Sequence, residues 1–275
     1  MPGDGNEVPS IKNAMCTRQK KGNTNSMNPM RLKYPRLYKV IQEAVGELYY
    51  EGLGLGTVVR AINRRSLRQA ERKYGDPVEV SYKFRGLPPA RTIEPCQIEW
   101  ELKRLVQIVR TEAPKVICEI GTDHGGTLYC WAKAAAPDAL VISIDLPRLY
   151  RKTLNRFFRS FVSAGQTIHF VRANSQDDAC LAEVKRILDG RKIDFLFIDG
   201  DHSYEGVKSD FLMYSKLVRD GGLIALHDIV EHSMDRNRCD VERFWHELKP
   251  LHACTELIAR PGQDCGGIGL VTYRE

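Results

Sequence analysis

KVICEIGTDHGG, residues 115–126, joins an apolar strand-like run to a glycine-rich turn and the start of a helix-like run. Gly121 permits a tight turn and a close approach of the backbone to a ligand. Gly125 and Gly126 open the next helix, whose unpaired N–H groups suit an anion such as a carboxylate. The dinucleotide-binding pattern G-x-G-x-x-G requires glycine at position 123, where Asp123 would repel a pyrophosphate. The stretch therefore predicts a ligand-binding strand–turn–helix unit, with an ordinary glycine-rich turn as the alternative.

The same alternation of apolar and helix-like runs continues along most of the chain. We expect strands at 115–120, 140–145, 168–173, 193–199 and 222–228, and helices at 126–136, 148–163, 178–189, 204–218 and 240–248. Nearly continuous apolar strands that alternate with helices are typical of a parallel sheet covered on both faces. The sequence therefore predicts five parallel βα units.

Two further apolar runs, 254–259 and 267–273, break this alternation. A short turn segment joins them, whereas a parallel crossover needs about a dozen residues, so we expect an antiparallel hairpin. A dinucleotide-binding fold would continue with a sixth parallel strand instead. The predicted fold class is α/β: a Rossmann-like seven-stranded sheet of five parallel βα units plus a C-terminal antiparallel hairpin, with an N-terminal helical extension.

Three segments are expected along the chain. They are a flexible basic leader over 1–33, a helical extension and cap or linker over 34–95, with a helix at 57–73 and a connecting segment at 75–95, and a ligand-binding domain over 96–275. Residues 1–40 carry eight Lys and Arg against two acids, which accounts for the whole net charge of +6, so the remainder of the chain is neutral. Nucleic-acid enzymes normally place basic residues on the working domain, which argues against a nucleic-acid partner. Contact of the leader with an anionic partner stays open.

The composition of the 275 residues, 43% hydrophobic and 28% charged, is typical of a soluble globular protein. No apolar run approaches the roughly 18 residues of a membrane helix, and the first thirty residues lack a secretory apolar region. We therefore expect a cytoplasmic protein without a membrane partner, and a homo-oligomer stays open. The eight cysteines form no C-x-x-C pair, which excludes zinc ribbons, and Cys118 and Cys130 are predicted to be reduced and buried.

Polar residues follow the second and third predicted strands. Asp145 ends the second strand 24 residues after Gly121, where an acid can accept both hydroxyls of a ribose. This contact would serve a nicotinamide cofactor and any other adenosine-like ligand equally. Asn174-Ser-Gln-Asp177 ends the third strand with groups suited to an adenine edge. Capping of the following helix is the alternative role for this segment.

The fourth and fifth strands end in acids and histidines. Asp199, Asp201 and His202 follow the fourth strand, and His227-Asp228 ends the fifth. Clustering such groups is costly unless a cation or a substrate organises them. The two strands should be neighbours, so these side chains can converge. Carboxylates suit Mg²⁺, and a histidine ligand also permits Mn²⁺.

Four motifs in this order, VICEIGTDHGG, ANSQD, FLFIDGDHSYEGV and GGLIALHD, together resemble class I S-adenosylmethionine (SAM)-dependent methyltransferases. More narrowly, they resemble the cephalosporin hydroxylase-like branch and its sugar and macrolide O-methyltransferase relatives, over about residues 84–273. The resemblance implies a SAM site made by Glu119, Gly121, Thr122, Gly125, Thr127, Asp145, Ser175, Gln176 and Asp199.

Related catechol-type O-methyltransferases bind Mg²⁺ through an acid after the fourth strand and an acidic pair after the fifth. The resemblance thus implies a metal site of Asp199, His227 and Asp228, with Mg²⁺ or Mn²⁺ as the ion. His227 replaces the first acid of the pair, which removes one negative charge. In the metal-free alternative, Asp199 contacts the amino group of SAM and His227 lines the pocket.

The predicted reaction is methyl transfer from SAM to a hydroxyl of a small molecule, such as a sugar or a glycosylated metabolite. His202 is the predicted general base, as an unperturbed imidazole with a pKa near ~6.5, and Asp199 is the alternate base. One rival is an NAD(P)-dependent oxidoreductase on the same sheet. The other is a catalytically silent SAM-fold protein whose basic leader binds a partner.

Overall fold

The computed structural model describes residues 55–147, 151–232 and 239–274. The strands are β1 (Val116–Ile120), β2 (Leu140–Asp145), β3 (Thr167–Arg172), β4 (Ile193–Ile198), β5 (Val218–His227), β6 (Ala253–Leu257) and β7 (Ile268–Thr272). The helices are α3 (Leu55–Tyr74), α4 (Pro77–Lys83), α5 (Glu99–Glu112), α6 (Gly126–Ala134), α7 (Arg151–Phe158), α8 (Asp178–Leu188), α9 (Tyr204–Tyr214) and α10 (Val241–Leu248), with 3-10 turns at Ser215–Leu217 and Lys249–Leu251.

The strands form a single seven-stranded sheet in the order β3-β2-β1-β4-β5-β7-β6. Strands β1 to β5 are parallel, and β7 runs antiparallel to both β5 and β6. The predicted α/β class, with five parallel βα units and a terminal antiparallel hairpin, is confirmed.

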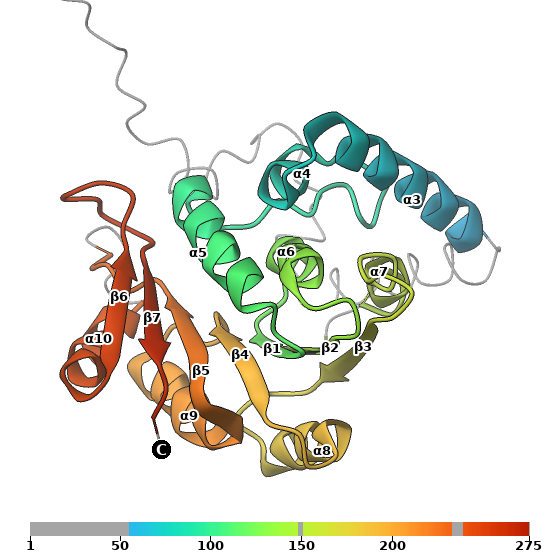
Figure 1. Cartoon of the computed structure of the whole chain (residues 1–275). Coiled ribbons are helices and arrows are strands. Elements are labelled where there is room, and N and C mark those ends of the chain that lie inside the picture. The colour runs from blue at the N-terminus through green and yellow to red at the C-terminus, as the bar shows by residue number, and fades with distance from the viewer. Residues whose placement is uncertain (1–54, 148–150, 233–238, 275) are drawn as a thin grey trace, which may run out of the picture. The chain divides into compact units, whose positions relative to one another are not determined.

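Helices cover both faces of this sheet (Figure 1). α5, α6 and α7 lie over one face, and α8, α9 and α10 lie over the other. Successive residues of β4 enter opposite cores: Phe195 packs with Trp131 of α6, whereas Leu196 belongs to the core that contains Phe211 of α9. Because side chains alternate between the faces of a strand, burial on both faces requires the continuous apolar run seen in the sequence.

Strand register brings the predicted site to one edge of the sheet. Ile120, the last residue of β1, pairs with Ile144 of β2 and Ile198 of β4, and Ile198 pairs with Leu226 of β5. The residues that follow these positions therefore emerge side by side. The prediction that the fourth and fifth strands are neighbours is confirmed.

Several element boundaries differ from those expected. The prediction of a connecting segment over 75–95 is wrong for Pro77–Lys83, which form α4. Asp76 caps this helix by accepting from two backbone N–H groups at 3.0 Å, and Pro77 supplies a preset first turn. α9 ends at Tyr214 and β5 begins at Val218, four residues before its predicted start. The 3-10 turn between them tightens the connection.

The segment before residue 96 contributes to the same core as the sheet domain. Val78 and Phe84 are fully buried in one cluster with Leu102 and Leu105 of α5. The predicted leader and the first part of the extension lie outside the described residues, and the proposed boundary at 95/96 stays a prediction. α5 has no counterpart among the predicted elements.

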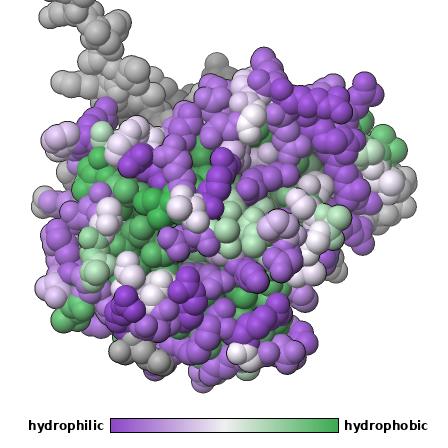
Figure 2. Space-filling model, viewed as in Figure 1, coloured by the Kyte–Doolittle hydropathy of each residue, from purple (hydrophilic) through white to green (hydrophobic). Residues whose placement is uncertain are grey.

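The surface visible in Figure 2 is mostly hydrophilic, with an apolar area over α5 and the neighbouring β6–β7 region. No helix in the described part of the chain is both long enough and apolar enough to cross a membrane. Cys118 and Cys130 are free and fully buried, as predicted. Burial raises the pKa of both thiols, which makes them unreactive.

Candidate active site

The turn after β1 closes tightly on the end of β4. Gly121 has a φ of +89°, and a Cβ atom at this position would lie 1.9 Å from the backbone oxygen of Asp199. Two backbone hydrogen bonds, from Gly121 N to Ile144 O and from Asp199 N to Ile120 O, both 2.9 Å, tie the turn to β2 and β4. Only glycine fits here, so the predicted cofactor turn and Asp199 are held in fixed relation.

Asp145 supports the same turn from β2. Its Oδ2 atom accepts hydrogen bonds from the backbone N–H groups of Thr122, at 3.2 Å, and Asp123, at 2.9 Å. The carboxylate is buried and adjoins the glycine turn, as the sequence predicts for a ribose-binding acid. The ribose contact itself stays a prediction.

Glu119, Thr122 and Thr127 form a buried network beneath the turn. Glu119 is fully buried and accepts from Trp131 Nε1 at 2.9 Å. Burial raises its pKa to about 7, although hydrogen bonds from Thr127, Thr122 and Trp131 oppose the shift. Thr122 also pairs with Ser143 through their hydroxyls at 2.7 Å. These contacts give the three predicted cofactor residues a supporting role under the turn, and their contact with SAM stays a prediction.

The segment after β3 reaches toward β4. Gln176 donates from Nε2 to Asp201 Oδ2 at 3.3 Å, and the Ser175 carbonyl accepts from Tyr214 OH at 2.8 Å. Asp177 occupies the N-cap position of α8 but makes no side-chain capping bond. The N-cap residue of α8 therefore does not cap the helix with its side chain, which was the alternative role for this segment.

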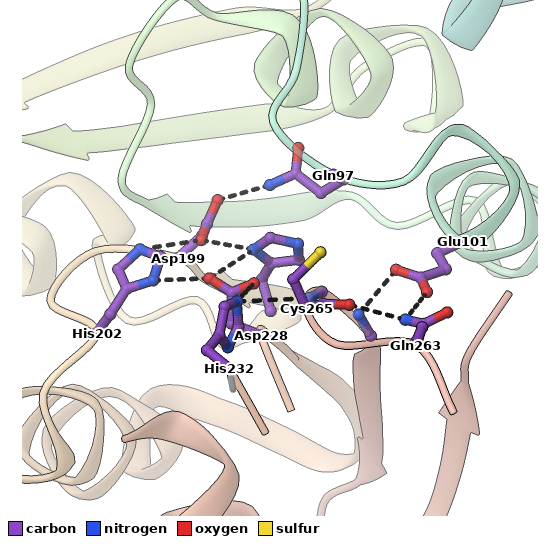
Figure 3. Close-up of polar contacts among 11 residues, drawn as sticks. Gln97, Glu101, Asp199, His202, Asp228, His232, Gln263 and Cys265 are labelled. Atoms are coloured by element: carbon purple, nitrogen blue, oxygen red, sulfur yellow. Dashed lines mark hydrogen bonds and ion pairs between the residues drawn. The ribbon is translucent and has the colours of Figure 1, made fainter. Parts of the chain in front are cut away.

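Asp199 lies at the centre of a network of polar side chains (Figure 3). Its Oδ2 accepts from Gln97 Nε2 at 2.7 Å, and its Oδ1 lies 3.1 Å from His227 Nδ1 and 3.5 Å from His202 Nε2. Gln97 is buried in the segment just before α5. The structure thus brings together the predicted residues Asp199, His202 and His227.

Asp228 is surrounded by three imidazoles. Its Oδ2 lies 2.7 Å from His202 Nδ1 and 3.4 Å from His227 Nδ1, and its Oδ1 lies 3.2 Å from His232 Nε2. Asp228 has a φ of +64°, a left-handed conformation that costs a non-glycine residue about 1 kcal/mol or more. The surrounding contacts hold this strained residue in place. We call Asp199, Asp228 and the three histidines the Asp199–Asp228 cluster.

The two carboxylates keep the imidazoles protonated. The hydrogen bond to Asp228 raises the pKa of His202 to about 10, with help from Cys239 and Asp199 and against burial. The same two hydrogen-bond partners, Asp228 and Cys239, raise the pKa of His232 to about 10. Burial opposes protonation of His227, but the charges of Asp228 and Asp199 raise its pKa well above the usual value. The expectation of an unperturbed pKa for His202 is therefore wrong for the metal-free chain.

The attraction between carboxylates and imidazoles also keeps Asp228 ionised. Burial alone would raise its pKa, but the charge on His227 and hydrogen bonds from the three imidazoles hold the pKa well below its usual value. The metal-free cluster is thus a compact set of alternating charges.

The geometry also fits a metal ion at the predicted residues. Ligand atoms of Asp199, His227 and Asp228 all lie within 4.8 Å of one another. His227 Nε2 is buried without a hydrogen-bond partner among the described residues. Two carboxylates supply hard oxygens for Mg²⁺, and the imidazole makes Mn²⁺ more acceptable.

Sequence reasoning missed three members of this region: Gln97, His232 and Cys239. His232 follows Asp228 by four residues, a spacing that could have drawn attention to it. Gln97 is 102 residues from Asp199 and carries no local signal. Cys239 belongs to no cysteine motif in the sequence. Burial would raise the pKa of its half-buried thiol, but hydrogen bonds from His202 and His232 lower this pKa to about 7.

Comparison with known proteins agrees with the fold. Residues 118–229 match the sequence model of a family described as a methyltransferase domain. Uncharacterized protein R132 of Acanthamoeba polyphaga mimivirus is 32% identical over 120 residues, which make up 42% of this chain and 51% of that protein. The chain thus spans about half the length of this curated relative.

Two solved structures share the architecture. The O-methyltransferase TomG from Streptomyces achromogenes, involved in tomaymycin synthesis and solved in complex with SAM, is 19% identical, with 78% of this chain and 90% of that chain covered and a TM-score of 0.50. A Staphylococcus aureus protein assigned as a caffeoyl-CoA O-methyltransferase is 18% identical, with 77% and 100% covered and a TM-score of 0.55. At these identities the likeness shows the fold alone. Together with the family match, it confirms the resemblance to class I SAM-dependent methyltransferases, while the cephalosporin hydroxylase-like branch stays a prediction.

Proposed function

We propose that this chain, which carries a class I methyltransferase domain, transfers the methyl group of SAM to a hydroxyl of a small molecule. The observation that carries the proposal is the position of the Asp199–Asp228 cluster directly beside the glycine turn, with Asp199 shared by both. Methyl transfer needs donor and acceptor to be held about 3 Å apart and the acceptor proton to be removed. The Asp199–Asp228 cluster supplies groups that can remove the proton, and it lies beside a glycine turn that is suited to holding the methyl donor.

The cofactor would lie along the ends of β1 to β3. Gly121 leaves the backbone open to close approach, and the start of α6 offers N–H groups to the carboxylate of SAM. Asp145 would accept the ribose hydroxyls, and Ser175 and Gln176 would face the adenine. TomG, which has the same fold, was solved in complex with SAM, and this supports SAM as the cofactor that we propose.

Asp199, His227 and Asp228 would hold a divalent cation, Mg²⁺ or Mn²⁺, in this proposal. Such an ion, when bound, lowers the pKa of a coordinated hydroxyl. His202 would take the proton of the substrate hydroxyl at Nε2, while its Nδ1–H still donates a hydrogen bond to Asp228. A His202 ring that is protonated on both nitrogens cannot take this proton. The negative charge of Asp199 and Asp228, which raises the pKa of His202, must therefore first be offset. A sugar or a glycosylated metabolite is the acceptor class that we propose.

Ligand-dependent thermal unfolding tests the cofactor directly. SAM or S-adenosylhomocysteine at 100 times its dissociation constant should stabilise the chain by about 2.7 kcal/mol, and NAD(P)H should not. Transfer of a labelled methyl group from SAM to a panel of hydroxyl compounds then tests the reaction. Stabilisation by NAD(P)H alone would instead favour an oxidoreductase, and SAM binding without any transfer would favour a catalytically silent protein.

A further inference from the structure

The Asp199–Asp228 cluster extends to a cysteine that the proposed reaction does not use. Ligand atoms of His202, Asp228 and Cys239 all lie within 4.8 Å of one another, which makes a second group of potential metal ligands. They come from three places: the loop after β4, the end of β5 and the residues just before α10. The backbone N–H of Asp240 donates to His202 O at 2.8 Å, which fixes Cys239 beside the histidine.

The donors of this second group are softer than those of the first. A thiolate and an imidazole are ligands that Zn²⁺ favours, whereas Mg²⁺ takes oxygen. His232 lies on the other side of the Asp228 carboxylate, and its Nδ1 is buried without a hydrogen-bond partner among the described residues. A tetrahedral ion held by His202, Asp228 and Cys239 would take its fourth ligand from water.

We propose that His202, Asp228 and Cys239 form a binding site for a thiophilic divalent cation, and that Zn²⁺ is the physiological ion. The site shares Asp228 with the oxygen-rich group and takes the ring nitrogen of His202 as a ligand. Occupation therefore removes both a predicted base and a predicted ligand of the hard ion. This regulatory consequence rests on the proposed function, whereas the binding site itself does not.

Cobalt substitution tests the binding site without any assay of turnover. Co²⁺ added to the metal-free full chain should produce the near-ultraviolet charge-transfer absorption of a cobalt–thiolate bond, and Zn²⁺ should remove it. Cys239→Ser should abolish the absorption, and Cys254→Ser, at a cysteine in β6, should retain it. Absence of the band in the natural chain, or its survival in Cys239→Ser, would overturn the proposal.

A second variant guards against a folding defect in Cys239→Ser. His202→Gln leaves the thiol in place and should weaken Co²⁺ binding by at least about tenfold, with an unchanged circular dichroism spectrum. Unchanged Co²⁺ affinity in folded His202→Gln would remove the histidine from the site and overturn it.

Activity separates the regulatory consequence from the proposed function. Zn²⁺ should inhibit methyl transfer supported by Mg²⁺ or Mn²⁺, and Cys239→Ser should require at least about tenfold more Zn²⁺ for the same inhibition. Equal inhibition of both proteins would overturn the regulatory role. Failure of every sample to transfer a methyl group would count against the proposed function, and the cobalt band would still decide the site.

Discussion

The two halves of the sheet's carboxyl edge are built on different principles. In the β1–β2 half, backbone groups do the positioning: Gly121 packs against the end of β4, and Asp145 is satisfied by two backbone N–H groups. In the β4–β5 half, Asp199 and Asp228 contact imidazoles through side chains alone. The first half is therefore held in place by the backbone itself. The second depends on charge, and therefore on protons and ions.

The difference matters because backbone hydrogen bonds do not titrate and charged pairs do. Changes in the β1–β2 half should act through folding and cofactor affinity. Changes in the β4–β5 half should act through metal affinity and pH. The following predictions test that division.

The largest effect is expected for Gly121→Ala. The new Cβ would overlap the backbone of Asp199, so the variant should lose at least about 4 kcal/mol of unfolding free energy. Gly190→Ala is the matched control, because Gly190 also has a positive φ but no atom within 4 Å of its added Cβ. It should lose only about 1 kcal/mol. Urea unfolding measures both, and equal losses would show that the close approach to β4 is unimportant.

Asp228→Asn should disable the β4–β5 half alone. Loss of one carboxylate charge should lower Mg²⁺ or Mn²⁺ affinity by about 100-fold while SAM affinity stays nearly intact. EDTA should abolish methyl transfer by the natural chain, and Mg²⁺ or Mn²⁺ should restore it. Calorimetry measures the two affinities, with Asp220→Asn, at an exposed residue paired with Arg274, as the control. Full turnover in EDTA would defeat the metal role.

Asp145→Ala should have the opposite profile. Loss of the predicted ribose acceptor and of support for the turn should weaken SAM binding at least tenfold, or about 1.4 kcal/mol, without changing metal affinity. Calorimetric titration of the folded variant provides the measurement. Unchanged SAM affinity would show that Asp145 only supports the turn.

The smallest effect is a pH dependence of stability in EDTA. Folding raises the pKa of His202 and His232 from about 6.5 to about 10, so the folded chain binds these protons more tightly than the unfolded chain. Their contribution is complete below pH ~6.5 and is lost as the pH rises through about 10. Solvent screens these partly exposed rings, and the lowered pKa of Cys239 makes stability rise with pH over the same range, so the net decrease should be at most about 1 kcal/mol per pH unit.

Urea unfolding at pH 7 and pH 9 measures this slope, and His232→Gln should flatten it. A slope that is unchanged in the variant would mean that His232 does not hold an extra proton in the folded state.

The sequence alone determined the sheet and the residues at its edge. A parallel strand with two buried faces must be apolar throughout, so the five strands are legible as runs, and the residues after them must share one edge. Asp145, Asp199 and Asp228 were found in this way. The C-terminal hairpin could be distinguished from the parallel units because a parallel crossover connection needs more residues than the short segment between the last two strands provides.

The tertiary structure decided what those residues contact. Gln97 reaches Asp199 across 102 residues, and His232 and Cys239 join the cluster from irregular segments that have no periodicity to reveal them. The protonated state of His202 was likewise invisible in the sequence, because a pKa depends on the distance to neighbouring charges and on burial. Local patterns record which face of an element is buried, whereas the partners of a polar group are set only when distant segments meet.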